Sequence, residues 1–203
     1  MINIAVFISG RGSNFLALLK NIEKGVLKNC KIAVVFSNNP NAKGLEYAAE
    51  AGIKTIVIPS KNRSDRVEYD KEIINTLSEY SIDLICLAGY MRIVTEELVE
   101  AYKNKIINIH PALLPSFPGL HAQKQALDYG VKVSGCTVHF VDGGMDTGPI
   151  ILQKTVPVYD NDTEDTLSAR ILEQEHTAYS EALSLYAAGR LKVSGRKVEI
   201  LDK

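Results

Sequence analysis

The chain has few cysteines, no long apolar run and almost no net charge, and each shortage excludes a class of protein. Its three cysteines, Cys30, Cys86 and Cys136, form no C-x-x-C pair, which predicts reduced core thiols rather than disulfides or a zinc site. No apolar run approaches the roughly 20 residues that a transmembrane helix needs. The net charge of −1 gives no general attraction to nucleic acid or to an anionic membrane.

The N-terminal segment also lacks the features of a targeting sequence. Residues 1–8 have no basic leader and no small-residue cleavage site, and they are expected to form a buried strand instead. Together with reduced cysteines, this predicts a cytoplasmic protein. The 203 residues, 46% hydrophobic and 23% charged, suit one α/β domain with a sizeable core.

Short β-branched runs alternate with longer amphipathic segments in the first half of the chain. Because the runs are apolar on both faces, they predict a mostly parallel sheet with helices on both sides, which is a Rossmann-like, doubly wound arrangement. Ser13 is placed to cap the first helix and Gly52 to close the second. Strands are expected at 2–8, 32–36, 55–58, 84–87 and 105–109, and helices at 14–24, 42–51, 66–80 and 95–102.

The second half has two longer apolar runs joined by a turn rich in Asp and Gly. Residues 131–141 and 150–158 predict an antiparallel hairpin. A long final helix is expected over 163–188, followed by short strands at 191–193 and 197–201. Because no linker, repeat or low-complexity segment occurs, residues 1–203 are expected to form a single domain with two halves, 1–102 and 103–203.

The segment Ser9-Gly-Arg-Gly-Ser-Asn14 follows the first expected strand and opens the first expected helix. Amides at a helix N-terminus attract anions, and glycines let the backbone close around a phosphate. A dinucleotide site is disfavoured because Phe15 occupies the place of the third glycine and Asn38-Asn39 replaces the ribose-binding carboxylate. A single phosphate group fits best. A turn needed only for chain reversal is the alternative.

Asn108 and His110 lie two residues apart at the carboxyl end of a predicted strand, so their side chains are expected on one face. Ligands of open α/β sheets bind at that end of the strands. Pro111 favours extended geometry at His110, and further prolines stiffen the following loop. The Leu114-Pro115 bond is a candidate for the cis form. A histidine bonded only to a backbone carbonyl is the alternative for His110.

Asp146 lies in the turn at 142–148, where a plain hairpin connection would also explain an aspartate. Together with Asn108 and His110, however, it supplies a carboxylate beside an imidazole and an oxyanion donor. No Ser or Cys has the context of a nucleophile elbow, and no metal-ligand spacing occurs. These residues therefore predict direct acyl transfer between two bound substrates, without a covalent enzyme intermediate.

Four segments of the chain match the pattern of a known family: 7–14, 88–93, 108–117 and 142–150. They resemble the formyltransferase family, and within it the glycinamide ribonucleotide formyltransferases of purine synthesis. The Asn-x-His plus Asp set is shared by the wider family, whereas the glycine loop and Ala88-Gly-Tyr-Met-Arg-Ile93 narrow the resemblance. The resemblance covers essentially the whole chain.

The resemblance implies that N10-formyltetrahydrofolate, as co-substrate, donates a formyl group to the amine of glycinamide ribonucleotide. The implied catalytic residues are Asn108, His110 and Asp146, in the second half of the chain. The implied phosphate ligands are Gly12, Ser13 and Asn14, and Glu175 is implied for the ribose hydroxyls. The implied folate site is lined by Arg66, Met91, Arg92, Ile93, Val94 and the loop from Val141 to Asp146.

The expected partners are these two small molecules, with no nucleic acid, membrane or metal ion, and the chain is expected to be a monomer or a homodimer. Two positions depart from the simplest pattern. Leu172 stands where the family often has glutamine, so the ribonucleotide contacts on that side are expected to differ. For Arg66, a solvated charge on a helix face is the alternative to a folate contact.

Other members of the family would use the same Asn-His-Asp chemistry. A methionyl-tRNA formyltransferase needs a further domain and positive charge for phosphate contacts, neither of which is expected here. A sugar-nucleotide formyltransferase is a related alternative, and a hydrolase that releases formate is another, although such hydrolases carry an added N-terminal regulatory domain. A binder of phosphorylated metabolites with a silent site is the non-enzymatic alternative.

Overall fold

The computed structural model describes residues 1–202, and the chain divides into two compact units, Met1–Asn108 and Ile109–Lys203. The division falls inside strand β5 (Ile106–His110). The expectation of one domain over 1–203, with halves dividing after residue 102, stays a prediction. No helix among the described residues is long and apolar enough to cross a membrane.

The first unit contains a parallel sheet in the order β3-β2-β1-β4-β5. Residues 4–8 in β1 are completely buried, which explains why this strand is apolar on both faces. The strand order reverses between β1 and β4, and in open α/β sheets ligands bind at such a switch point. The strands are β1 (Ile2–Ile8), β2 (Cys30–Ser37), β3 (Lys54–Val57), β4 (Leu84–Leu87) and β5.

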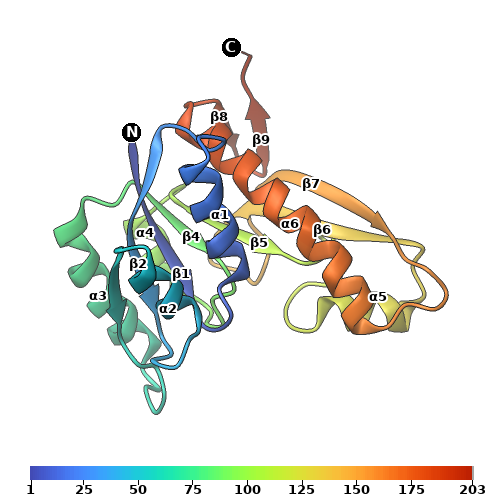
Figure 1. Ribbon diagram of the computed structural model, residues 1–203, viewed down its shortest axis with the longest axis horizontal. Helices are drawn as coiled ribbons and strands as arrows, with labels where there is room; N and C mark the ends of the chain where they lie inside the picture. Colours follow the sequence, from blue (N-terminus) through green and yellow to red (C-terminus); the bar gives the residue numbers. More distant parts are fainter. Residues whose placement is uncertain (203) are drawn as a thin grey trace. The chain divides into compact units, whose positions relative to one another are not determined.

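Four α-helices connect these strands. Since crossovers between parallel strands are right-handed, the reversal in strand order places the first two helices on one face of the sheet and the last two on the other. Figure 1 shows α1 in front of the strands and α4 behind them. The predicted doubly wound arrangement is therefore confirmed. The helices are α1 (Ser13–Glu23), α2 (Gly44–Glu50), α3 (Arg66–Leu77, continued by a 3-10 turn at Ser78–Tyr80) and α4 (Glu96–Ala101).

The start of α1 differs from the expectation. Ser13 is already helical, and Gly12 with φ 72° occupies the cap position without a side-chain cap. The prediction that Ser13 caps the helix is therefore wrong, because a left-handed glycine turns the chain one residue earlier. Gly52, with φ 66°, follows α2 as expected of a glycine that ends a helix.

The second unit contains the predicted antiparallel hairpin and the long final helix. Strand β6 (Val133–Phe140) pairs antiparallel with β7 (Ile150–Pro157). Strands β8 (Leu191–Ser194) and β9 (Lys197–Ile200) form a second antiparallel pair. Helix α6 (Glu164–Ala187) packs against both β6 and β7, as Figure 1 shows. Its first turn is fixed by a capping box between Thr163 and Thr166.

One helix of this unit has no counterpart among the predicted elements. Helix α5 (Ala122–Tyr129) has eight residues and buries only Ala122 and Ala126. His121 and Gly130 flank it, both with left-handed backbone. So short a helix with so small an apolar face produces almost no periodic signal in the sequence. The Leu114-Pro115 bond before it is cis.

Candidate active site

The glycine loop of the first unit connects β1 to α1 and is fixed against the start of α2. The amide of Gly44 donates a hydrogen bond to the carbonyl oxygen of Gly10 at 3.1 Å. A Cβ atom on Gly12 would lie 2.8 Å from the Cα of Gly44, so only glycine allows this approach. The loop therefore holds the first amides of α1 in one position, which is what a backbone anion site requires. Ser13 and Asn14 form the first turn behind it.

A polar network that the sequence did not reveal lies beside this loop. The Ser9 hydroxyl donates to Asn38 Oδ1 at 2.6 Å and accepts a hydrogen bond from the amide of Met91 at 2.8 Å. Asn38 Nδ2 donates to the Ser60 hydroxyl at 3.0 Å, and Asn39 Nδ2 to the Ser9 carbonyl at 3.0 Å. In the sequence, these two asparagines were noted only because they replace the ribose-binding carboxylate of a dinucleotide site. They tie together the segments that follow β1, β2 and β3, and Ser9 adds the segment that follows β4.

The segment after β4 carries the residues implied for the folate. Met91 and Ile93 are exposed apolar side chains, whereas Val94 is buried. The Arg92 guanidinium carbon lies 4.3 Å from the centre of the Tyr69 ring. Its Nε and Nη2 atoms are buried and have no hydrogen-bond partner among residues 1–202. Buried donors without partners are rare in native proteins, so Arg92 is a candidate to meet a ligand group.

Helix α3 is hydrogen-bonded to the residue that follows this segment. Asp70 is buried, and its carboxylate accepts hydrogen bonds from the amide (2.6 Å) and the hydroxyl (2.9 Å) of Thr95. Burial is the largest influence on this carboxyl and raises its pKa, although the bonds from Thr95 and the charge of Arg92 act against that rise. Arg66, at the first position of α3, is exposed. Its exposure fits a solvated charge as well as a ligand contact.

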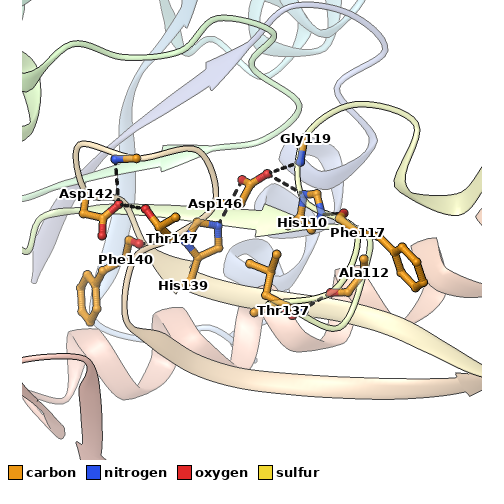
Figure 2. Close-up of polar contacts among 12 residues, drawn as sticks. His110, Ala112, Phe117, Gly119, Thr137, His139, Phe140, Asp142, Asp146 and Thr147 are labelled. Carbon is orange, nitrogen blue, oxygen red and sulfur yellow. Dashed lines mark hydrogen bonds and ion pairs between the residues drawn. The ribbon is translucent and has the colours of Figure 1, made fainter. Parts of the chain in front are cut away.

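Strand β5 carries Asn108 and, two residues later, His110. His110 is buried, and both of its ring nitrogens face oxygen atoms of the second unit. Its Nδ1 lies 3.3 Å from Asp146 Oδ2, and its Nε2 lies 2.8 Å from the carbonyl oxygen of Phe117, as Figure 2 shows. The structure therefore brings together the predicted imidazole and carboxylate, which are 36 positions apart in the printed sequence.

Asp146 lies between two histidines. Its backbone is left-handed, with φ 54°, and its Oδ2 accepts a hydrogen bond from the amide of Gly119 at 2.8 Å. The other oxygen, Oδ1, lies 3.7 Å from Nε2 of His139 (Figure 2). His139 is buried near the end of β6, and its Nδ1 lies 2.8 Å from the carbonyl oxygen of Phe140. An aspartate held in this way is more than a plain hairpin connection.

His139 is the site residue that sequence reasoning missed. It was included in the apolar run 131–141 as part of a strand, and no motif drew attention to it. The available signal was a histidine within a strand that is otherwise buried and mostly apolar. Such a residue needs a polar partner, because burying an unpaired polar group is costly.

The charges of this cluster follow from burial and from its contacts. Burial lowers the pKa of His110, and it outweighs the Asp146 carboxylate and the Phe117 carbonyl, which act in the opposite direction. Burial acts to raise the pKa of Asp146, but bonds from His139 and Gly119 and the nearby imidazoles outweigh it and leave that pKa below its ordinary value. Asp146 thus favours the charged form of His110, but burial has the larger effect on that imidazole. The pair at neutral pH is a carboxylate beside a neutral imidazole.

Glu175 lies on the buried face of α6, one turn beyond Ile171 and one turn before Tyr179. Burial, and next the charge of Glu175, raise the pKa of Cys136 to about 12. A carboxylate within an apolar helix face is uncommon unless it has a partner or a function. Leu172, at the position where glutamine was expected, is half-buried. All three cysteines are buried free thiols.

The fold and this cluster define a class of protein. The family model described as formyl transferase matches residues 2–183, and the chain belongs to that family. Among its relatives, phosphoribosylglycinamide formyltransferase of Escherichia coli is 44% identical over 191 residues, which cover 94% of this chain and 90% of that protein.

A fruit-fly relative and a solved structure extend this comparison. The trifunctional purine biosynthetic protein adenosine-3 of Drosophila melanogaster is 45% identical over 194 residues, 94% of this chain, but the chain spans only 14% of that protein. The crystal structure of glycinamide ribonucleotide transformylase 1 from Symbiobacterium toebii superposes with a TM-score of 0.96 at 50% identity. That superposition covers 100% of this chain and 95% of the other.

Proposed function

We propose that this protein transfers the formyl group of N10-formyltetrahydrofolate to the amine of glycinamide ribonucleotide, in the cytoplasm, as a step of purine synthesis. The products are formylglycinamide ribonucleotide and tetrahydrofolate. The observation that carries the proposal is the buried contact between His110 and Asp146 in a member of the formyl transferase family. The similarity to the Escherichia coli enzyme over nearly its full length supports the choice of substrates.

The proposed reaction begins with attack of the neutral amine on the formyl carbon. A new carbon–nitrogen bond forms, and the formyl oxygen becomes negatively charged in a tetrahedral intermediate. Asn108 donates a hydrogen bond to that oxygen and His110 gives a second stabilising contact, which lowers the barrier most when charge develops in the transition state. The bond from carbon to N10 of the folate then breaks.

Proton transfer in this scheme belongs to Asp146. Its lowered pKa keeps it a carboxylate at neutral pH, so it is able to accept the proton that the amine loses on attack. The same proton passes through water to the departing nitrogen of the folate. His110, neutral before attack, takes up positive character as the proton nears the pair.

The substrate contacts are assigned on the same basis. The backbones of Gly12, Ser13 and Asn14 hold the ribonucleotide phosphate, because the loop fixes the first amides of α1. Glu175 accepts hydrogen bonds from the ribose hydroxyls. The folate lies against Met91, Arg92, Ile93, Val94 and the loop from Val141 to Asp146, and Arg66 contacts its tail; the buried donors of Arg92 without partners among the described residues support this placement.

A spectrophotometric assay tests the proposal directly. Purified protein is mixed with the formylfolate donor, with and without glycinamide ribonucleotide, and tetrahydrofolate formation and product mass are measured. We expect donor consumption that depends on the ribonucleotide and a product heavier by one formyl group. Consumption without the ribonucleotide would instead identify a hydrolase. Absence of consumption at saturating substrates would leave a metabolite binder.

A further inference from the structure

The loop that carries Asp146 is fixed internally by two residues to which the proposed reaction assigns no chemical step. Asp142 Oδ1 accepts a hydrogen bond from the amide of Gly144 at 3.1 Å and another from the hydroxyl of Thr147 at 2.6 Å. One carboxylate oxygen therefore joins residues on both sides of Asp146. Figure 2 shows this contact between β6 and β7, next to the cluster of His110, His139 and Asp146.

The backbone of Asp146 explains why such a connection is needed. Its φ of 54° is left-handed, a conformation that is uncommon for residues with a Cβ atom, although Asp adopts it more readily than most. The neighbouring glycines leave room for a tight turn. A Cβ atom on Gly144 would lie 2.1 Å from the Thr147 hydroxyl, and one on Gly148 would lie 1.8 Å from the carbonyl oxygen of Phe140. Thr147 therefore packs directly against Gly144, at a spacing set by its hydrogen bond.

We propose that Asp142 and Thr147 are positioning residues that hold Asp146 in the orientation in which its carboxylate faces His110, His139 and the amide of Gly119. This inference rests on the role assigned to Asp146 in the proposed function. The hydrogen bonds of these two residues lie within the loop itself. Without the Asp142–Thr147 bond, the loop is free to relax towards extended backbone, which withdraws the carboxylate from its partners.

The pH dependence of turnover reports whether the Asp146 carboxylate has moved away from its partners. The groups facing Asp146 are His110 from β5, His139 from β6 and the Gly119 amide from the loop before α5. The nearby imidazole of His139 and the hydrogen bond from the Gly119 amide keep the pKa of Asp146 low against the effect of burial. If the carboxylate loses them, its pKa rises, and the acid limb of the turnover profile moves to higher pH.

The test compares two substitutions of one side chain. Thr147→Val keeps the shape of threonine but removes the hydroxyl, whereas Thr147→Ser keeps the hydroxyl. We expect Thr147→Val to lower kcat about tenfold, since small displacements of catalytic groups cost one to two orders of magnitude. The KM for glycinamide ribonucleotide should stay the same, and the acid limb of the turnover profile should move to higher pH. Thr147→Ser should restore both the kcat and the pH of the acid limb to the values of the parent protein. Thr155→Val, at an exposed threonine of β7, is the matched control.

A double substitution shows whether the two residues act as one unit. Asp142→Ala should resemble Thr147→Val, and the Asp142→Ala/Thr147→Val double variant should be no worse than either single variant. Equal kcat for the Val and Ser variants, or additive losses in the double variant, would overturn the proposal.

Hydrogen exchange at the Gly144 amide gives a readout that does not depend on turnover. It should speed up in Thr147→Val and not in Thr147→Ser. Unprotected exchange already present in the parent protein would also refute the inference. If the parent protein is inactive, but its Gly144 amide is protected and responds to the two substitutions as expected, the proposed function alone is refuted.

Discussion

The glycine loop of the first unit and the Asp146 loop of the second both connect regular elements by a tight left-handed turn, but they achieve it in opposite ways. In the first, Gly12 adopts φ 72° without strain and allows the backbone of Gly44 to approach closely. In the second, Asp146 adopts φ 54° although it has a side chain. Its carboxylate accepts a hydrogen bond from the Gly119 amide, and the Asp142–Thr147 hydrogen bond lies in the same loop. A site made of backbone amides needs a residue without a Cβ atom. A site made of a side chain has to tolerate the strain.

The side-chain site should respond most strongly to substitution. We expect Asn108→Ala and His110→Ala each to lower kcat about 100- to 1000-fold, because each removes a group that stabilises the charged oxygen of the intermediate. Steady-state kinetics with both substrates measures the loss, and circular dichroism checks the fold. His121→Ala, at an exposed histidine, is the control and should keep full turnover. Near-normal turnover of either active-site variant would remove that residue from the mechanism.

The backbone site should be disturbed by a single methyl group, and the chain contains its own control. Gly12 and Gly25 have similar positive φ values, 72° and 67°, but a Cβ atom on Gly25 would meet nothing within 4 Å. Gly12→Ala should raise the KM for the ribonucleotide about tenfold and lower the melting temperature more than Gly25→Ala. Both substitutions place a Cβ atom on a residue with positive φ, but only the one at Gly12 adds a clash with Gly44. A larger substitution such as Gly12→Val would add disruption of the fold. If Gly12→Ala instead changes only the KM for the folate donor, the phosphate assignment is wrong.

The smallest expected effect concerns how the free energy of unfolding depends on pH. The pKa of His110 in the folded chain lies below 6.5, so below that pH the unfolded chain binds a proton that the folded chain does not. Stability should therefore fall as the pH drops through that window, and Asp146, with a pKa below 3.8, adds a further loss only under more acidic conditions.

Urea unfolding at about pH 7.5 and about pH 5.5 measures this change through the transition midpoint. The midpoint should fall less with acid in His110→Gln than in the parent protein. His121→Gln, changed at an exposed histidine, should behave like the parent. An equal fall in all three proteins would show that His110 is not buried as a neutral ring.

The same contrast between backbone and side chain explains what the sequence could predict. The parallel strands, the hairpin and α6 follow from apolar periodicity over many residues, and each was found. Helix α5 was missed because eight residues with two buried alanines carry almost no pattern. The cap of α1 was placed on Ser13 because residue preference favours serine, whereas the close approach of Gly44 decides in favour of Gly12.

Some residues of the candidate site were also expected from the sequence, and others were not. Taken singly, Asp146 fits a plain turn and His110 fits a backbone contact, and only their combination with Asn108 pointed to a site. His139 lay inside a predicted strand, and the turn that brings Asp146 back beside it has no pattern of its own in the sequence. The Ser9–Asn38 bond likewise joins residues that follow different strands. Such contacts depend on the fold and leave no local mark.

His110 lies between two acceptors, the Asp146 carboxylate and the Phe117 carbonyl, and this has a consequence for the timing of proton movement. A neutral imidazole has one N–H, so it donates to only one of the two oxygens at a time. One additional proton lets the ring donate to both. In the proposed reaction, the proton that the attacking amine gives to Asp146 is shared with the His110 ring, which then donates to both oxygens. The proposed attack thus completes the hydrogen bonds of this cluster and links the rearrangement of bonds at the formyl carbon to a local gain in order.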